Sequence, residues 1–367
     1  MGLINLSVSN APLIGHLIAS AVLSLLLCLL APLIGRVLGL MDDPKAKAHS
    51  LHERKTPLVG GIAVLLPWGI LTGGDAILVE FLSQAENVSR LNGWLAVFIL
   101  AIAAVGALDD RFHLTARLRL AVMAPMFLLF VFFNPAFGIA YLSSPALGIS
   151  VPLGFLSVPF TALCLLAFTN AVNMTDGRNG LVIGLSLIWC LTLSFYVPAD
   201  YKVMLYAVMA SLLVTGLYNL NGRLFLGDTG TYGLAALIGL TGLYAHGIPS
   251  EAGGISSTQL ATIFAIPGLD MFRLIVDRFS LGVSPMAGDH DHLHHRLERF
   301  IGWRLGLPVY LVLAGTPILI ACSAPYMGTP GLIAACVVYG AAWLATRRYR
   351  QHQGLSGGSR PGERVLG

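Results

Sequence analysis

The sequence predicts an all-α integral membrane protein whose chain crosses a bilayer about eleven times. Hydrophobic residues make up 56% of its 367 residues and charged residues 11%, and the mean hydropathy is +0.78. A soluble globular protein carries about 25% charged residues. The polar residues also fall in short gaps between apolar stretches of roughly 17 to 25 residues, each long enough to cross the hydrocarbon core. Composition and spacing together predict a polytopic membrane protein.

Each apolar stretch is expected to form one transmembrane helix. The predicted spans are residues 11–40, 58–82, 93–108, 120–142, 145–168, 180–198, 202–221, 231–248, 258–277, 305–324 and 329–346. The first span follows an uncharged N-terminus without a small-residue cleavage signal, so we expect a retained helix rather than a signal peptide. Residues 1–346 then form one polytopic membrane domain. The basic tail, residues 347–367, has the composition of a disordered segment.

The basic residues predict the orientation of the chain. Arg90 and Lys202 lie in one set of gaps, and almost all other basic residues lie in the alternate set, which the positive-inside rule places in the cytoplasm. The N-terminus is then outside and the C-terminus cytoplasmic. The cytoplasmic gaps are residues 41–57, 109–119, 169–180, 219–230 and 278–304. The net charge of +4 therefore reflects topology and contact with anionic membrane lipid, not binding of nucleic acid.

The third cytoplasmic gap, TNAVNMTDGRNGL, is the most unusual polar segment, because polar interruptions inside a membrane protein are usually functional. Asn170, Asn173 and Asp176 are three residues apart, so at a helix end they form one ridge of oxygen ligands. The ridge fits an enzyme site or the ligand site of a transporter.

The first gap reads MDDPKAKAHSLHERKTPLVGG and contains Lys47, Arg54 and Lys55. These side chains have the charge to hold phosphates, although a basic loop after a first span is also a plain topology signal. The second gap contains Asp109 and Asp110 in the string GALDDRFHLTARLRL. Such a pair fits a metal site, a proton-transfer group or a helix cap.

The fourth gap contains Asp228 between Gly227 and Gly230, in LFLGDTG. A carboxylate in a small-residue turn can approach a cation closely, with backbone N–H groups free for phosphate. An N-terminal cap of the following helix is the alternative.

The last gap, SPMAGDHDHLHHRL, holds four histidines within six residues, and a flexible metal-binding tract is the alternative to an active-site loop. Before it, Asp270, Arg273 and Asp277 form a charged helical face, which is either functional or a ladder of ion pairs.

Carboxylates, carboxamides, basic residues and histidines at one membrane face fit a phosphoryl transfer between a soluble nucleotide and a lipid. A donor diphosphate and a lipid phosphate repel each other, by roughly 1 kcal/mol for unit charges about 4 Å apart in water and by several times more in a drier cleft. A divalent cation and basic residues must offset this repulsion. Mg²⁺ prefers carboxylate, phosphate and water oxygens, so the aspartates and asparagines suit it better than the histidines do.

These residues make the chain resemble the polyprenyl-phosphate N-acetylhexosamine-1-phosphate transferase family, the MraY and WecA group of membrane enzymes. The resemblance extends from about Asp42 to Arg296 and rests on five motifs in the family's order. The motifs are the first loop from Asp43-Pro44 to Gly60-Gly61, GALDDRF, NAVNMTDGRNGL, LFLGDTG and the SPMAGDHDHLHHRL end. The HLHH form and the GALDDRF string make the WecA-like branch the nearer one.

The resemblance implies an enzyme of the bacterial plasma membrane with its catalytic loops in the cytoplasm. Such an enzyme transfers an N-acetylhexosamine 1-phosphate, such as GlcNAc 1-phosphate or a deoxy or epimeric relative, from a UDP-sugar to undecaprenyl phosphate and releases UMP. This is the first membrane step of cell-surface glycan synthesis, for example of O-antigen, common antigen or teichoic acid. The resemblance is also compatible with a homodimer.

The resemblance further implies residue roles. Asp228 matches the family's Mg²⁺ ligand, with Asn173 as co-ligand and Mn²⁺ as a substitute metal. Asp109 and Asp110 match a pair that acts as a base or organises the site, and Asp176 joins them as a catalytic candidate. Because a phosphate needs little deprotonation near neutral pH, we expect the pair to position other groups.

Two further sets of residues follow from the same match. The nucleotide and sugar candidates are Asn170, Asp176, Asn179, Arg278, Asp289, His292, His294 and His295. The candidates for the phosphates are Lys47, Arg54 and Lys55.

Three features depart from the family pattern. Arg178 and Asn179 replace the usual apolar residue and second aspartate of DGxDGL, so donor contacts are expected to differ there. His290 stands where the family usually has arginine, and the first loop holds about two extra residues.

Two other function classes stay open from sequence. A prenyltransferase of the UbiA type also uses aspartates and Mg²⁺ at a membrane face, but it needs paired DxxxD-like motifs that this chain lacks. A transporter coupled to protons or metal ions would place ionisable residues near mid-span, whereas here they cluster at the predicted cytoplasmic ends.

Overall fold

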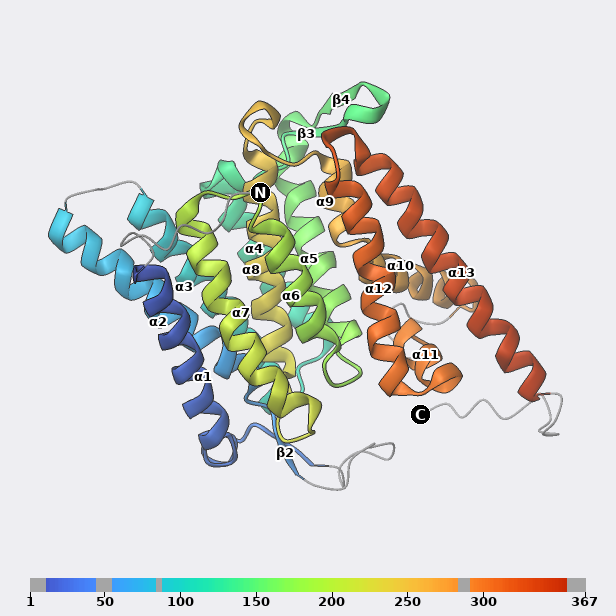
Figure 1. Cartoon of the computed structure of the whole chain (residues 1–367), viewed down its shortest axis with the longest axis horizontal. Coiled ribbons are helices and arrows are strands. Elements are labelled where there is room, and N and C mark those ends of the chain that lie inside the picture. The colour runs from blue at the N-terminus through green and yellow to red at the C-terminus, as the bar shows by residue number, and fades with distance from the viewer. Residues whose placement is uncertain (1–10, 44–54, 84–87, 283–290, 355–367) are drawn as a thin grey trace.

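The computed structural model describes residues 11–43, 55–83, 88–282 and 291–354, and its long helices form a single bundle (Figure 1). The helices are α1 (Ala11–Leu38), α2 (Gly60–Ser83), α3 (Val88–Phe112), α4 (Ala116–Phe133), α5 (Ser157–Thr175), α6 (Leu181–Leu193), α7 (Ala199–Leu220), α8 (Gly227–Gly247), α9 (Ser257–Ile263), α10 (Ala265–Ser280), α11 (Leu293–Ile301), α12 (Trp303–Cys322) and α13 (Gly328–Gly354). Two short antiparallel pairs are added: β1 (Met41–Asp42) with β2 (Thr56–Pro57), and β3 (Tyr141–Ser144) with β4 (Ile149–Pro152). The predicted all-α class is confirmed.

Within the described ranges, seven helices are long and apolar enough to cross a membrane, or eight when the bent pair α9 and α10 is taken as one span. Shorter apolar helices, Gly60–Thr72 and Leu181–Leu193, lie within two further predicted spans. Large apolar side chains point outward from the bundle, among them Val37 and Leu319 at 73% and 74% exposure. Such a surface suits lipid rather than water. The number of crossings and their orientation stay predictions.

Helix α8 forms the centre of the bundle and is buried on nearly every side. Its apolar residues surround the whole helix, which is typical of a helix enclosed by other helices. Glycines let its neighbours approach closely: a Cβ atom on Gly61 of α2 would lie 2.2 Å from the Gly230 nitrogen, and one on Gly106 of α3 would lie 2.3 Å from the Asp228 carbonyl oxygen. The first turn of α8 is therefore held by backbone contact on two sides.

This close packing predicts that Gly106→Ala lowers the free energy of unfolding by about 1–3 kcal/mol, because the added methyl group has no space without a backbone shift. The thermal unfolding midpoint of the detergent-purified protein measures the effect. Gly340→Ala is the matched control, since nothing lies within 4 Å of its added Cβ. An equal midpoint for the two variants would contradict the packing.

The structure corrects the predicted spans 120–142 and 145–168. Helix α4 ends at Phe133 and α5 begins at Ser157, and the chain between them contains the β3–β4 hairpin. Asn134-Pro135, Pro145, Gly148 and Pro152 interrupt helix formation here, and Gly148 adopts φ +63° at the hairpin turn. The segment has the hydropathy of a transmembrane helix but not the backbone of one.

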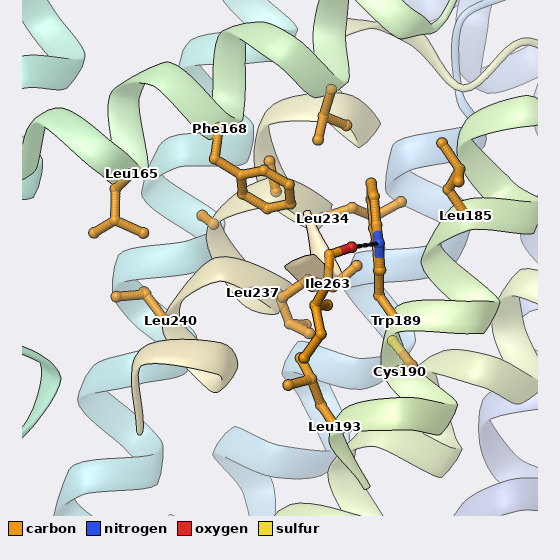
Figure 2. Packing of buried hydrophobic residues seen from close by; sticks show 14 of the residues in the cluster. Leu165, Phe168, Leu185, Trp189, Cys190, Leu193, Leu234, Leu237, Leu240 and Ile263 are labelled. Atoms are coloured by element: carbon orange, nitrogen blue, oxygen red, sulfur yellow. Dashed lines mark hydrogen bonds between the residues drawn. The ribbon is translucent and has the colours of Figure 1, made fainter. Parts of the chain in front are cut away.

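The predicted ninth span, 258–277, is also wrong as a single helix, because it bends by 76° between α9 and α10. Pro267 lacks an N–H, so it cannot donate to the Ile263 carbonyl four residues earlier. The Trp189 indole Nε1 donates to this oxygen instead, at 2.8 Å, and the two residues pack with Phe168 and leucines of α8 (Figure 2). The break is thus satisfied and stabilised by buried apolar contacts.

The last helix also differs from the sequence prediction. Helix α13 continues past the predicted end at residue 346 to Gly354, since Arg and Gln favour helix and no proline intervenes. The remainder of the predicted disordered tail, residues 355–367, lies outside the described part of the chain.

Candidate active site

A cavity of about 490 Å³ opens at one end of the bundle and receives residues from all five predicted cytoplasmic gaps. The sequence predicts that these gaps form one surface, and the structure brings their residues together. The lining residues are Asp42, Leu58, Asp110, His113, Asn173, Asp176, Gly177, Arg178, Asn179, Asn219, Phe225, Leu226, Gly227, Asp228 and Trp303. Four carboxyl groups in one cavity repel one another when ionised, unless a cation offsets their charge or one of them keeps its proton.

Asp110 caps the N-terminus of α8. Its Oδ1 accepts the Asp228 N–H at 2.8 Å, and its Oδ2 accepts the Thr229 N–H at 2.9 Å and the Thr229 hydroxyl at 2.8 Å. Gly227, at φ +72°, allows this approach, because a Cβ there would lie 2.7 Å from Asp110 Oδ2. Asp110 therefore fixes the backbone of the turn that carries Asp228.

Asp109 is buried and does not line the cavity. Its Oδ2 accepts hydrogen bonds from Arg119 Nη1 and from the Tyr232 hydroxyl, both at 2.8 Å. The two partners come from α4 and α8. The network joins α3, α4 and α8 below the cavity, which favours a positioning role for Asp109 over contact with substrate.

Asn173 and Asp228 meet inside the cavity, as the sequence analysis expects. Asn173 Nδ2 donates to Asp228 Oδ1 at 2.5 Å and to Thr231 Oγ1 at 3.1 Å. Asn173 lies near the end of α5, and Asp228 lies in the first turn of α8. The carboxylate and the carboxamide thus form one polar corner from two segments far apart in the chain.

Comparison with known proteins identifies the family to which this cavity belongs. Residues 92–246 match the model of glycosyl transferase family 4, and this region holds Asp110, Asn173, Asp176 and Asp228. Residues 92–246 belong to glycosyl transferase family 4 by this match. Helices α11 to α13 lie beyond the matched region.

Named relatives extend the likeness beyond that region. The chain is 27% identical over 312 residues to the probable undecaprenyl-phosphate N-acetylglucosaminyl 1-phosphate transferase of Bacillus subtilis, covering 81% of this chain and 82% of the relative. It is 29% identical over 282 residues to the undecaprenyl-phosphate alpha-N-acetylglucosaminyl 1-phosphate transferase of Escherichia coli K12, covering 72% and 71%. It is 27% identical over 281 residues to the decaprenyl-phosphate N-acetylglucosaminephosphotransferase of Mycolicibacterium smegmatis, covering 68% and 67%.

The described histidines of the last gap, His292, His294 and His295, lie outside the lining of the cavity. His292 Nδ1 lies 2.9 Å from Asp270 Oδ2, which fixes the orientation of the ring. His294 is buried against Gly177, and burial followed by the neighbouring His295 holds the pKa of His294 well below its usual value. His294 is therefore neutral at physiological pH.

The charged face of α10 forms the ion-pair ladder that the sequence leaves as one of two alternatives. Arg273 contacts Asp277 at 2.8 Å and Asp270 at 3.4 Å. Arg278 is buried at the end of the same helix, away from the cavity lining. The predicted nucleotide candidate Asp289 lies outside the described residues, as does His290.

The remaining candidates divide between the cavity and its surroundings. Asn179 lines the cavity, whereas Asn170 donates to the Leu166 carbonyl of its own helix at 2.7 Å and does not. Lys55 pairs with Asp43 at 2.6 Å, and its side chain is 64% exposed. Lys47 and Arg54 lie outside the described residues.

Several lining residues were missed from sequence, namely His113, Asn219, Phe225 and Trp303. His113, Asn219 and Phe225 lie inside or next to the motif strings, so their place in those strings was the available signal. Asn219 joins two segments, accepting the Gly180 N–H at 2.6 Å and donating to the Leu224 carbonyl at 3.0 Å. His113 adopts φ +51°, a conformation in which histidine is enriched among non-glycine residues.

The donor groups fit Mg²⁺. Asp228 and Asn173 provide carboxylate and carboxamide oxygens at one corner, and Mg²⁺ binds through one or two carboxylates together with phosphates and waters. Among the residues that the structure describes, no three His, Cys, Asp or Glu side chains are grouped closely enough to enclose a metal alone. A protein-only zinc cage is therefore not built in this part of the chain, whereas a metal shared with phosphate groups has its ligands.

The pKa of Asp176 predicts that the stability of the protein depends on pH. Burial, followed by the charge of Asp110, raises the pKa of Asp176 from 3.8 to about 7. Between these values the native state keeps a proton that the unfolded chain has lost, so the free energy of unfolding falls as the pH rises through this window. We expect the thermal unfolding midpoint of the ligand-free protein to decrease as the pH rises from about 4 to about 7. The midpoint of Asp176→Asn should decrease less over the same range.

Midpoints measured at several pH values between these limits test this expectation. Asp176→Ala is the companion variant, because it also removes the carboxyl group but offers no amide. Both variants are expected to show the shallower slope. An unchanged slope in both would show that Asp176 does not titrate in this range.

Proposed function

We propose that this protein transfers an N-acetylhexosamine 1-phosphate, first of all N-acetylglucosamine 1-phosphate, from its UDP-sugar to undecaprenyl phosphate and releases UMP. The observation that carries this proposal is the single cavity where Asp110, Asp176 and Asp228 meet Asn173. Relatives that match most of the chain carry the name of this activity. The cavity is large enough to admit part of a nucleotide sugar.

The reaction is an in-line displacement at phosphorus. An oxygen of the lipid phosphate attacks the β-phosphorus of the UDP-sugar, and the bond from that phosphorus to the bridging oxygen of UMP breaks. The lipid phosphate is the nucleophile and carries negative charge near neutral pH, so no side chain needs to remove a proton from it. The protein's contribution is positioning and charge compensation.

The aspartates have different roles in this positioning and charge compensation. Asp228 and Asn173 supply the oxygens that would hold Mg²⁺, which when bound offsets the charge of the diphosphate and the acceptor phosphate. Asp110 holds the turn that carries Asp228, and Asp109 supports α3 and α8 through Arg119 and Tyr232. Arg178 also lies in the cavity wall, where its charge is paired with Glu298.

An apolar groove supports the proposal that the acceptor is a lipid. A second cavity of about 300 Å³ lies between α5, α8, α9 and α10, lined by side chains such as Leu165, Phe168 and Phe264. Its lining includes Ala171 of α5, the helix that also carries Asn173, although the two residues lie on different faces of that helix.

We further propose that the protein lies in a bacterial plasma membrane with the cavity open to the cytoplasm, where UDP-sugars are available. The product would enter synthesis of a cell-surface glycan. The homodimer stays a prediction.

The purified protein, mixed with UDP-N-acetylglucosamine and undecaprenyl phosphate, is expected to release UMP and form a lipid diphosphate sugar. Removal of divalent cations with EDTA should abolish the reaction, Mg²⁺ should restore it, and Mn²⁺ should substitute. The control omits undecaprenyl phosphate and should release no UMP. Full activity in EDTA would contradict the metal, and absence of UMP with a panel of UDP-N-acetylhexosamines would contradict the function.

A further inference from the structure

Three consecutive residues of the cavity wall, Gly177 to Asn179, each contact α11 or the first residue of α12. These contacts join segments more than a hundred residues apart in the sequence. The partners lie beyond residue 246, where the family match ends. The wall therefore depends on a part of the chain outside the matched region.

The contact of Arg178 is ionic. Its Nη2 pairs with Glu298 Oε2 of α11, and the two side chains are only 19% and 24% exposed. Arg178 also lines the cavity. In a partly buried pair, removing one partner leaves a charge without compensation, whereas exchanging both charges keeps the pair.

The neighbours of Arg178 make contacts of other kinds. The Trp303 indole Nε1 donates to the Asn179 carbonyl at 3.0 Å. The His294 ring packs on Gly177 so closely that a Cβ there would lie 2.1 Å from its Nε2. His294 and Glu298 are one helical turn apart, so one face of α11 meets the segment.

Because the three contacts differ in kind, Gly177, Arg178 and Asn179 have different roles. Trp303 binds a backbone carbonyl, so this bond does not depend on which side chain follows at position 179. Gly177 fits by the absence of a side chain. Of the three contacts, that of Arg178 is made by its side chain and depends on its charge. It therefore needs the opposite charge of Glu298 on α11.

We propose that Arg178 and Glu298 form a latch, an ion pair that holds α11 and Trp303 against the part of the cavity wall that carries the nucleotide candidates Asp176 and Asn179. The latch thereby sets the affinity for the UDP-sugar. This inference rests on the proposed transferase function. Arg178 stands at a position where the resembled family usually has an apolar residue, so the latch is a property of this chain's own pair. Arg178 and Glu298 are positioning residues in this scheme.

A charge-exchange cycle tests the latch. The variants are Arg178→Glu, Glu298→Arg and the double exchange, each assayed for UMP release at varied UDP-N-acetylglucosamine and at varied undecaprenyl phosphate. Each single variant is expected to raise the KM for the donor about tenfold or more, with little change in the KM for the acceptor. The double exchange is expected to return the donor KM to within about threefold of wild type.

Arg304→Glu is the matched control, because it makes the same charge change at an exposed neighbour of Trp303. It should leave the donor KM unchanged. If a charge reversal reduces the yield of folded protein, Arg178→Gln, Glu298→Gln and their double variant give the same cycle, and the double is then expected to be no worse than either single.

The outcomes separate the latch from the transferase function. A double exchange as poor as the poorer single variant, or single variants with the wild-type donor KM, would overturn the latch in an active enzyme. A wild-type protein that forms no lipid-linked sugar phosphate would instead overturn the proposed function on which the latch rests.

Discussion

The Asp228→Asn enzyme is expected to lose roughly 10²-fold to 10³-fold in the rate of sugar-phosphate transfer. Loss of a carboxylate that holds a catalytic cation removes several kcal/mol of charge stabilisation, and each 1.36 kcal/mol corresponds to a tenfold change in rate. Asp228 lies in the first turn of α8, and its carboxylate is 2.5 Å from Asn173 Nδ2. Asparagine has nearly the same size, so the packing of α8 should be retained.

UMP release by purified wild type and variant, each at saturating UDP-sugar and lipid, measures this effect. Asp277→Asn is the matched control, because Asp277 is half exposed, pairs with Arg273 and lies away from the cavity. The control should retain wild-type kcat. Wild-type activity in Asp228→Asn would remove Asp228 from the reaction.

Asp110→Ala is expected to reduce both activity and stability. The change leaves the Asp228 N–H, the Thr229 N–H and the Thr229 hydroxyl without their acceptor, which costs about 1–3 kcal/mol of folding free energy. Because the freed turn also carries Asp228, kcat should fall by roughly 10²-fold. Thermal midpoints and kcat of the same preparations measure the two effects.

Ser256→Ala provides the control for a lost helix cap. Ser256 accepts the Gln259 N–H in a capping box at the start of α9, distant in sequence from the cavity residues. Its loss should cost about 1 kcal/mol of stability without a change in kcat. If Asp110→Ala behaved in the same way, Asp110 would be a structural cap with no influence on catalysis.

Much of the site could be predicted because polar residues are rare in this chain and their positions are therefore informative. The five gaps that the sequence places on one face do line one cavity. The meeting of Asn173 with Asp228 also follows the prediction. In both cases the cost of polar groups within apolar helices confines them to places where they have partners.

The division of labour between Asp109 and Asp110 could not be read from their adjacency. Successive residues on a helix point about 100° apart, so one carboxylate faces the cavity while the other faces Arg119 and Tyr232. Hydropathy alone also missed the bend at Phe264 between α9 and α10 and the hairpin after Phe133, because apolar residues continue through both. The Arg178–Glu298 pair joins segments whose proximity only the fold creates.

The most direct test of the account follows the β-phosphate. Wild type is incubated with undecaprenyl phosphate and UDP-N-acetylglucosamine labelled separately in the sugar and in the β-phosphorus. Both labels are expected to appear together in the lipid product, in equal amounts and with one UMP released per product. Asp228→Asn is expected to form this product roughly 10²-fold to 10³-fold more slowly. Sugar label in the lipid with the β-phosphorus left in UDP would contradict the account.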